Sequence, residues 1–128
     1  MTARVQDAGL ANLTTAWAGY ASLPKYLQWG TGSGAAKTAN VVTTTSTTES
    51  RTTGTVSQQT SSVTNDTYRV VGTITAAGTR AITEVGVFDD AGSGSPPTGG
   101  NMDIYGDFTV INLSSGDNIQ FTINTTFS

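Results

Sequence analysis

Neither histidine nor cysteine occurs in this sequence of 128 residues. Their absence excludes a thiol nucleophile, disulfide bonds, an imidazole general base and metal sites built on thiolate or imidazole ligands. The composition therefore disfavours catalysis. We expect a protein that is not an enzyme and that binds no cofactor.

Charged side chains are scarce as well. They make up 12% of the chain and give a net charge of −3, and their share is about half that of an ordinary soluble domain. No run of about 20 apolar residues is available to span a membrane, and the first ten residues lack the apolar core of a secretion signal. We therefore expect assembly in a cytoplasm, without a membrane partner.

The basic residues stand singly along the chain, so they form no stripe that could follow a phosphate backbone. Nucleic acid is therefore not an expected partner. The six basic positions are Arg4, Lys25, Lys37, Arg51, Arg69 and Arg80.

Small polar residues dominate what is present. The chain has 25 threonines, 12 serines and 15 glycines, and these residues disfavour the interior of helices. Such a composition suits short strands joined by tight turns. It predicts an all-β protein.

One segment near the N-terminus departs from this pattern. Over residues 6–21, apolar side chains recur at spacings of three and four, which predicts a short helix. Asp7 is a candidate cap and Pro24 a stop signal. We therefore expect an arm over residues 1–22, with one apolar face made of Leu10, Leu13, Trp17 and Tyr20.

Beyond residue 24 the apolar period changes to two. Alternation predicts strands over 25–30, 67–75, 82–88, 102–110 and 119–127, and β-propensity predicts one around 48–58. The loop over 89–100 is too rich in Gly and Pro for a ladder. These strands predict a single domain over 23–128, an antiparallel, jelly-roll-like β-sandwich of six to eight strands. Its inward residues on the last two strands are Met102, Ile104, Phe108, Val110, Ile119, Phe121, Ile123 and Phe127.

Two patterns imitate binding sites. The Gly-rich segment 30–38 suggests a phosphate loop, but Ala36 and Thr31 stand where that motif needs glycine. Four aspartates are candidates for a calcium site, but they lack the spacing of a calcium loop. We interpret the Gly-rich segment as a turn and the aspartates as residues that cap turns, and we expect no bound metal. The four aspartates are Asp89, Asp90, Asp103 and Asp107.

Aromatic residues crowd into residues 17–29. Trp17, Tyr20, Tyr26 and Trp29 are four of the ten aromatics. They either pack the arm onto the sandwich or form an anchor patch for a partner, since Trp and Tyr are enriched in interface hot spots. The candidate partner-binding residues are Leu10, Leu13, Trp17, Tyr20, Tyr26 and Trp29.

Three sequence segments and their order along the chain indicate a protein family. They read Lys-Tyr-Leu-Gln-Trp-Gly-Thr-Gly at 25–32, Ile-Thr-Glu-Val-Gly-Val-Phe-Asp at 82–89 and Tyr-Gly-Asp-Phe-Thr-Val-Ile-Asn-Leu-Ser-Ser-Gly-Asp-Asn-Ile-Gln-Phe at 105–121, with a Thr-rich stretch between the first two. In this order, over residues 8–128, the chain resembles a family of small virion structural proteins of tailed bacteriophages. Its members are capsid decoration (cement) proteins or tail-fibre-like structural proteins.

The resemblance implies a role without chemistry and supplies no catalytic residue. It implies a decoration protein on the outer surface of the capsid, with the major capsid protein and copies of itself as partners. A homotrimer is the first expectation and a dimer the alternative. The arm 1–22 and the Thr-rich segment 38–62 are the candidate contacts with the capsid lattice.

Two other roles remain open at this point. A tail-fibre or tail-tip component is one, although the chain has no internal repeat along a shaft. The other is a carbohydrate-binding module on a virion, in which the aromatic residues between 17 and 29 would stack on a sugar.

Overall fold

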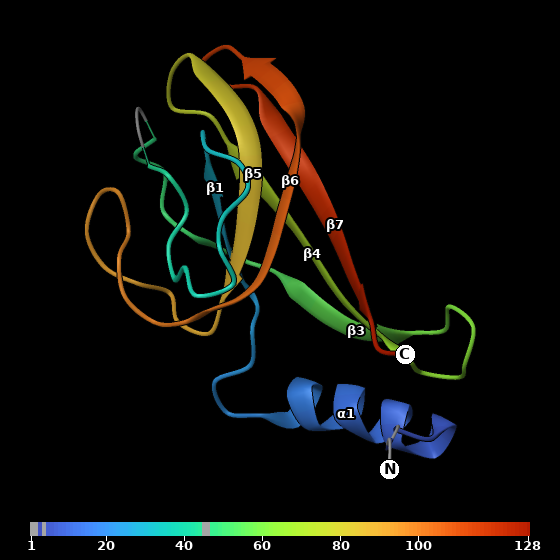
Figure 1. The fold of residues 1–128 in the computed structure, drawn as a ribbon. Helices are drawn as coiled ribbons and strands as arrows, with labels where there is room; N and C mark the ends of the chain where they lie inside the picture. The colour runs from blue at the N-terminus through green and yellow to red at the C-terminus, as the bar shows by residue number, and fades with distance from the viewer. Residues whose placement is uncertain (1–2, 4, 45–46) are drawn as a thin grey trace.

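Two antiparallel sheets face each other in the computed structural model, which describes residues 3, 5–44 and 47–128 (Figure 1). One sheet has the strand order β2-β1-β5-β6 and the other the order β3-β4-β7. The predicted all-β sandwich with an N-terminal helix is confirmed. Its elements are α1 (Asp7–Gly19), β1 (Tyr26–Gly30), β2 (Thr52–Thr53), β3 (Thr55–Gln59), β4 (Thr67–Thr75), β5 (Arg80–Phe88), β6 (Met102–Leu113) and β7 (Asn118–Thr126).

The core lies between the inner faces of the sheets. On β4 the residues predicted to face inward are buried, among them Tyr68, Val70 and Ile74. Strand β7 pairs with β4 along its whole length without a register shift, so its alternation also holds. Phe121 is buried, whereas its neighbour Thr122 is exposed. The predicted faces of these two strands are confirmed.

The prediction for β6 is wrong at Met102 and at Val110. Met102 pairs with Phe88 beyond a register shift, and its sulfur lies 2.7 Å from where a Cβ on Gly86 would be, on the outer side of the sheet. Val110 was expected to face inward, yet its side chain is 46% exposed. The ladder between β5 and β6 is irregular where Ile82 pairs with Ile111 and Glu84 with Asp107. Extra residues in one strand of a ladder interrupt the alternation of faces, so Val110 points outward while Phe108 still packs against the core.

The Thr-rich stretch forms two strands instead of one. Strand β2 pairs with β1, whereas β3 pairs with β4 in the opposite sheet. Gly54 stands at the crossing, and its N–H donates to the Lys25 carbonyl oxygen at 2.7 Å. A Cβ on this residue would lie 2.6 Å from Val70 and 2.8 Å from Leu27. The chain therefore changes sheets at a point too tight for a side chain.

Helix α1 completes the cover over the three-stranded sheet. This sheet extends beyond the four-stranded one, and α1 lies beneath the extension (Figure 1). The Trp17 ring lies 5.0 Å from the Tyr68 ring and 5.4 Å from the Phe127 ring, between ring centroids. The arm thus packs on its own sandwich.

The ends and the inward face of α1 differ in detail from the prediction. Its N-cap residue is Gln6, without a side-chain cap, so Asp7 begins the helix and does not cap it. Thr14 is fully buried, because its hydroxyl donates to the Asn65 carbonyl oxygen at 2.7 Å and accepts from the Gln58 amide at 2.6 Å. Leu13, one residue earlier, is consequently turned outward.

Candidate functional site

The six residues predicted to bind a partner lie in different environments. Leu10 and Trp29 are buried, at 5% and 1% exposure, and contribute to the packing of the domain. Trp17 and Tyr26 are half-buried. Leu13 and Tyr20 are 43% and 59% exposed on α1. The structure therefore does not gather the six into one patch, and leaves two of them as large exposed apolar side chains.

The exposed pair borders a shallow apolar hollow. Its volume is about 380 Å³, and it lies between α1 and the end of the chain after β7. Trp17 joins it to the core, since the same ring contacts Tyr68 and Phe127. The lining residues are Leu13, Ala16, Trp17, Tyr20 and Phe127.

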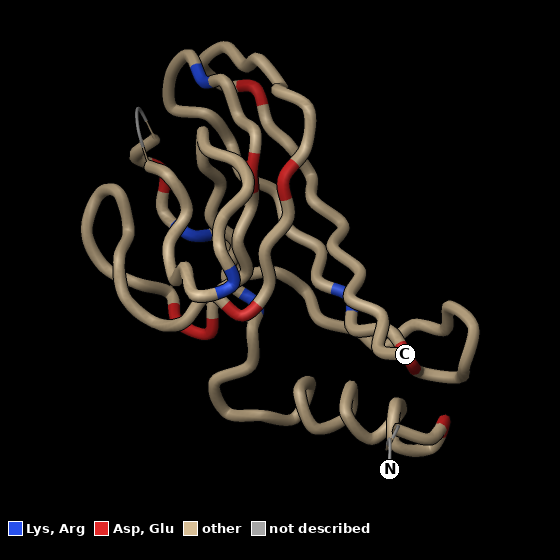
Figure 2. The backbone as a smooth tube through the Cα atoms, viewed as in Figure 1, with Lys and Arg blue, Asp and Glu red and all other residues tan. Residues whose placement is uncertain are grey.

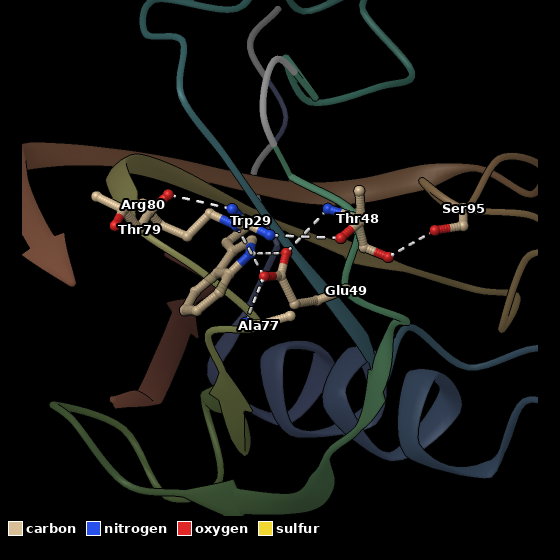
Figure 3. Close-up of polar contacts among 7 residues, drawn as sticks. All are labelled: Trp29, Thr48, Glu49, Ala77, Thr79, Arg80 and Ser95. Carbon is tan, nitrogen blue, oxygen red and sulfur yellow. Dashed lines mark hydrogen bonds and ion pairs between the residues drawn. The ribbon is translucent and has the colours of Figure 1, made fainter. Parts of the chain in front are cut away.

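Trp29, predicted as an interface aromatic, instead anchors an internal polar cluster (Figure 3). Its indole N–H donates to Glu49 Oε2 at 3.1 Å. Arg80 Nε and the Ala77 N–H both donate to the other oxygen, at 2.8 and 2.9 Å. Burial favours the neutral acid, but the hydrogen bonds from the Ala77 N–H, the Trp29 indole and the Thr48 N–H outweigh it and lower the pKa of Glu49 to about 2. The carboxylate therefore ties a loop to β1 and β5 of the four-stranded sheet and to the turn that follows β4.

Asp66 has an equally local role. The backbone N–H groups of Ser61, Ser62 and Val63 donate to its carboxylate at 2.8 to 3.1 Å. These bonds hold the pKa of Asp66 far below its usual range, against the effect of burial. The residue closes the turn between β3 and β4.

The Arg51 guanidinium holds the long loop after β5. It donates to the Gln28 side-chain oxygen at 2.9 Å and to the Asp90 and Gly99 carbonyl oxygens at 2.9 and 2.8 Å. It also stacks on the Phe88 ring, 3.7 Å from its centroid. These contacts give Arg51 a structural role in holding the loop against β1 and the end of β5.

Glu84 is buried on the outer side of the four-stranded sheet. It accepts hydrogen bonds from the Thr43 N–H and from the Tyr105 hydroxyl, the latter at 2.7 Å. Like Glu49 and Asp66, it therefore fastens an irregular segment onto a sheet. Within residues 3, 5–44 and 47–128, no three Asp or Glu side chains gather where they could hold a metal ion. The described helix is too short and too polar to cross a bilayer.

A larger groove opens along one side of the sandwich. Strands β6 and β7 are edge strands of opposite sheets, and the groove of about 740 Å³ lies between them. Apolar side chains at the margin of the core line it; Phe121 is buried and the others are partly buried. The principal ones are Ile104, Phe108, Ile119, Phe121 and Ile123.

This groove is not among the sites predicted from the sequence. The available signal was the last strand, residues 118–126, in which no residue is charged. Figure 2 shows β7 without blue or red along its length. That signal alone does not tell whether an uncharged strand lies in the middle of a sheet or at its edge.

Comparisons with known proteins leave the family open. No family model, no curated protein and no solved structure matches this chain.

Proposed function

We propose that this chain is a capsid decoration protein, a structural component without catalytic activity that binds the outer surface of a tailed-phage head and reinforces it. The three ordered segments at 25–32, 82–89 and 105–121 carry the resemblance behind this proposal. The partners are the major capsid protein and further copies of the chain.

The observation that supports a contact with another protein is the apolar hollow on α1. Leu13 on α1 and Tyr20 at its C-cap are large apolar residues that remain exposed. An exposed Tyr beside a half-buried Trp has the composition of an interface centre, where aromatic residues are enriched, more than of a solvated surface. We assign this hollow as the surface that meets the capsid.

The mechanism of reinforcement is avidity. A single hollow of this size offers a weak contact, because few side chains become buried. An oligomer that meets several capsid subunits at once gains a high effective concentration for each further contact. The decoration protein then links neighbouring subunits without any chemical step.

One feature also favours a second candidate function. The exposed Tyr20 ring beside Trp17 has the character of a platform on which a sugar ring stacks. A virion carbohydrate-binding module would use the same hollow. Binding of free glycans by the isolated protein would favour this function over decoration, and a tail location of the chain would favour a tail-fibre or tail-tip role.

The test compares two variants for binding to undecorated capsids. Leu13→Ser with Tyr20→Ser removes the exposed apolar side chains of the hollow and spares Trp17, so we expect folding but loss of capsid binding. Val41→Ser is the matched control, since Val41 is 62% exposed on a different part of the surface. Undiminished capsid binding by the double variant would contradict the proposal, as would finding the chain only in purified tails.

A further inference from the structure

The four sheet edges differ in how they are protected. Strand β2 has two residues, and β3 has five and is flanked by α1, to which Gln58 donates hydrogen bonds. Strand β6 carries Asp103 and Asp107. Strand β7 has nine residues, with no charge, no proline and no bulge. Natural edge strands are short, charged, bulged, interrupted by proline or covered, because an open edge of a sheet pairs with other chains. Strand β7 has none of these protections.

The backbone of β7 shows which residues face the open side. The Phe127 N–H donates to the Asp66 carbonyl oxygen at 3.0 Å, and the Asp117 carbonyl oxygen accepts from the Ala76 N–H at 2.7 Å. In an antiparallel ladder both backbone groups of a residue point to the same side, and the side alternates. The odd-numbered residues therefore bond to β4. The outward-facing backbone groups belong to Asn118, Gln120, Thr122, Asn124 and Thr126.

We infer that β7 pairs antiparallel with β7 of a second copy of this chain, across a two-fold axis at Thr122, and joins two three-stranded sheets into one of six strands. In this register every outward-facing residue meets another outward-facing residue. Thr122 meets its own counterpart, Gln120 meets Asn124, and Asn118 meets Thr126. The strands would exchange about ten backbone hydrogen bonds, two for each such pair.

The side chains of β7 are compatible with themselves in this register. On the outer face Gln120 meets Asn124 as amide against amide, Thr122 meets its own hydroxyl, and the Asn118 amide meets the Thr126 hydroxyl. On the inner face Phe121 meets Ile123. The charge pattern favours this occupant, because β7 itself carries no charge that would oppose its copy. The Arg69 guanidinium beside it, on β4, is already bonded to the Asn124 side-chain oxygen at 2.8 Å. An isologous contact requires such self-complementarity.

The same axis closes the groove beside β7. A two-fold axis perpendicular to the sheet keeps the inner faces of both copies on one side, so the two grooves face each other. The apolar side chains that line them, Ile104 and Ile123 among them, then become buried against the second copy. The assembly is a dimer, the alternative to the trimer that the resemblance implies. It provides the repeated copies that avidity on a capsid needs.

The experiment measures the mass of the full-length protein in solution by light scattering over a dilution series. The wild type should reach about twice the 13.2 kDa of one chain. Thr122→Lys places two ammonium groups side by side at the axis, where like charges repel, and should halve that mass. Thr73→Lys is the matched control, because Thr73 is exposed on the same face of the sheet, on β4, opposite Gln120; it should leave the mass unchanged.

Hydrogen exchange of the wild type supplies a second measurement that needs no variant. The amides of Gln120, Thr122 and Asn124 should exchange slowly when concentrated and rapidly when dilute, while those of Phe121 and Ile123 stay protected. A wild type that remains at 13.2 kDa, a trimer, or a Thr122→Lys variant of undiminished mass would overturn the inference. These measurements use no capsids, so their failure is separate from failure of the decoration function.

Discussion

The indole N–H of Trp29 donates to the carboxylate of Glu49 at 3.1 Å, across 20 residues of sequence. Trp29 lies on β1 in the core, whereas Glu49 lies in an irregular segment that also receives Arg80 from β5 (Figure 3). The ion pair between Glu49 and Arg80 is 2.8 Å long, and both side chains are largely buried. One carboxylate thus joins the aromatic core to a segment without regular structure.

Replacement of this carboxylate should destabilise the domain. In Glu49→Gln, one oxygen and one NH₂ group replace two oxygens that accept from Trp29, Thr48, Ala77 and Arg80. Because the NH₂ group would then face donors, we expect a loss of about 3 kcal/mol in the free energy of unfolding at pH 7. Urea denaturation measures this loss.

The same residue predicts an acid-sensitive window. The pKa of Glu49 is about 2 in the folded protein and 4.5 in its ordinary state. A lowered pKa stabilises the fold fully above pH 4.5, and this stability is lost as the pH falls from 4.5 towards 2. Glu49→Gln should therefore lose less stability than the wild type in that window. Equal pH slopes in the two proteins would contradict the role of the carboxylate.

Two neighbouring residues on β7 test the assignment of faces. Phe121 is buried and its ring lies 6.0 Å from that of Phe108, whereas Thr122 is exposed. Phe121→Ala should cost about 3–5 kcal/mol, while Thr122→Ala should have little effect on the unfolding of one chain. Thermal melts at low protein concentration compare the two. Equal effects would mean that the strand is rotated by one residue.

The attachment of α1 can be tested on its two faces. Trp17→Ala removes the ring that contacts Tyr68 and Phe127, and we expect a loss of about 2–3 kcal/mol, which lowers Tm by roughly 10 °C. Leu13→Ala, on the exposed face of the same helix, is the control and should leave Tm nearly unchanged. A similar Tm for the two variants would show that α1 does not pack as described.

The crossing at Gly54 predicts a steric effect. A methyl group there would meet Val70 and Leu27 in the core, so Gly54→Ala should destabilise by about 1–3 kcal/mol. Gly106→Ala on β6 is the control, since nothing lies within 4 Å of its added Cβ. Calorimetry of both variants measures the difference. Equal stability of the two would place the sheet crossing elsewhere.

Local patterns were sufficient for the long regular strands. The predicted range 67–75 coincides with β4, and 119–127 differs from β7 by one residue at each end. In both strands one face is apolar and no bulge interrupts the alternation, so the sequence period directly reports burial. The short helix was predictable for the same reason.

Features that depend on distant partners could not be read locally. Thr14 takes the inward place on α1 because Asn65 and Gln58 supply partners for its hydroxyl. Val110 turns outward because of an irregular pairing with β5. The candidate site shows the same limit, since Trp29 is as aromatic as Tyr20 but is buried by Glu49 and the sheets, while Tyr20 remains on the surface.

The contact between Trp17 and Phe127 also has a consequence for the timing of synthesis. These rings touch in the folded chain, yet 110 residues of sequence separate them. At about 5–20 residues per second, the ribosome makes Phe127 roughly 5 to 20 seconds after Trp17. During that interval α1 can meet β3 and β4, through Tyr68 and Gln58, but it lacks the part of its receptor that Phe127 supplies. Completion of the Trp17 pocket is therefore a late event of folding.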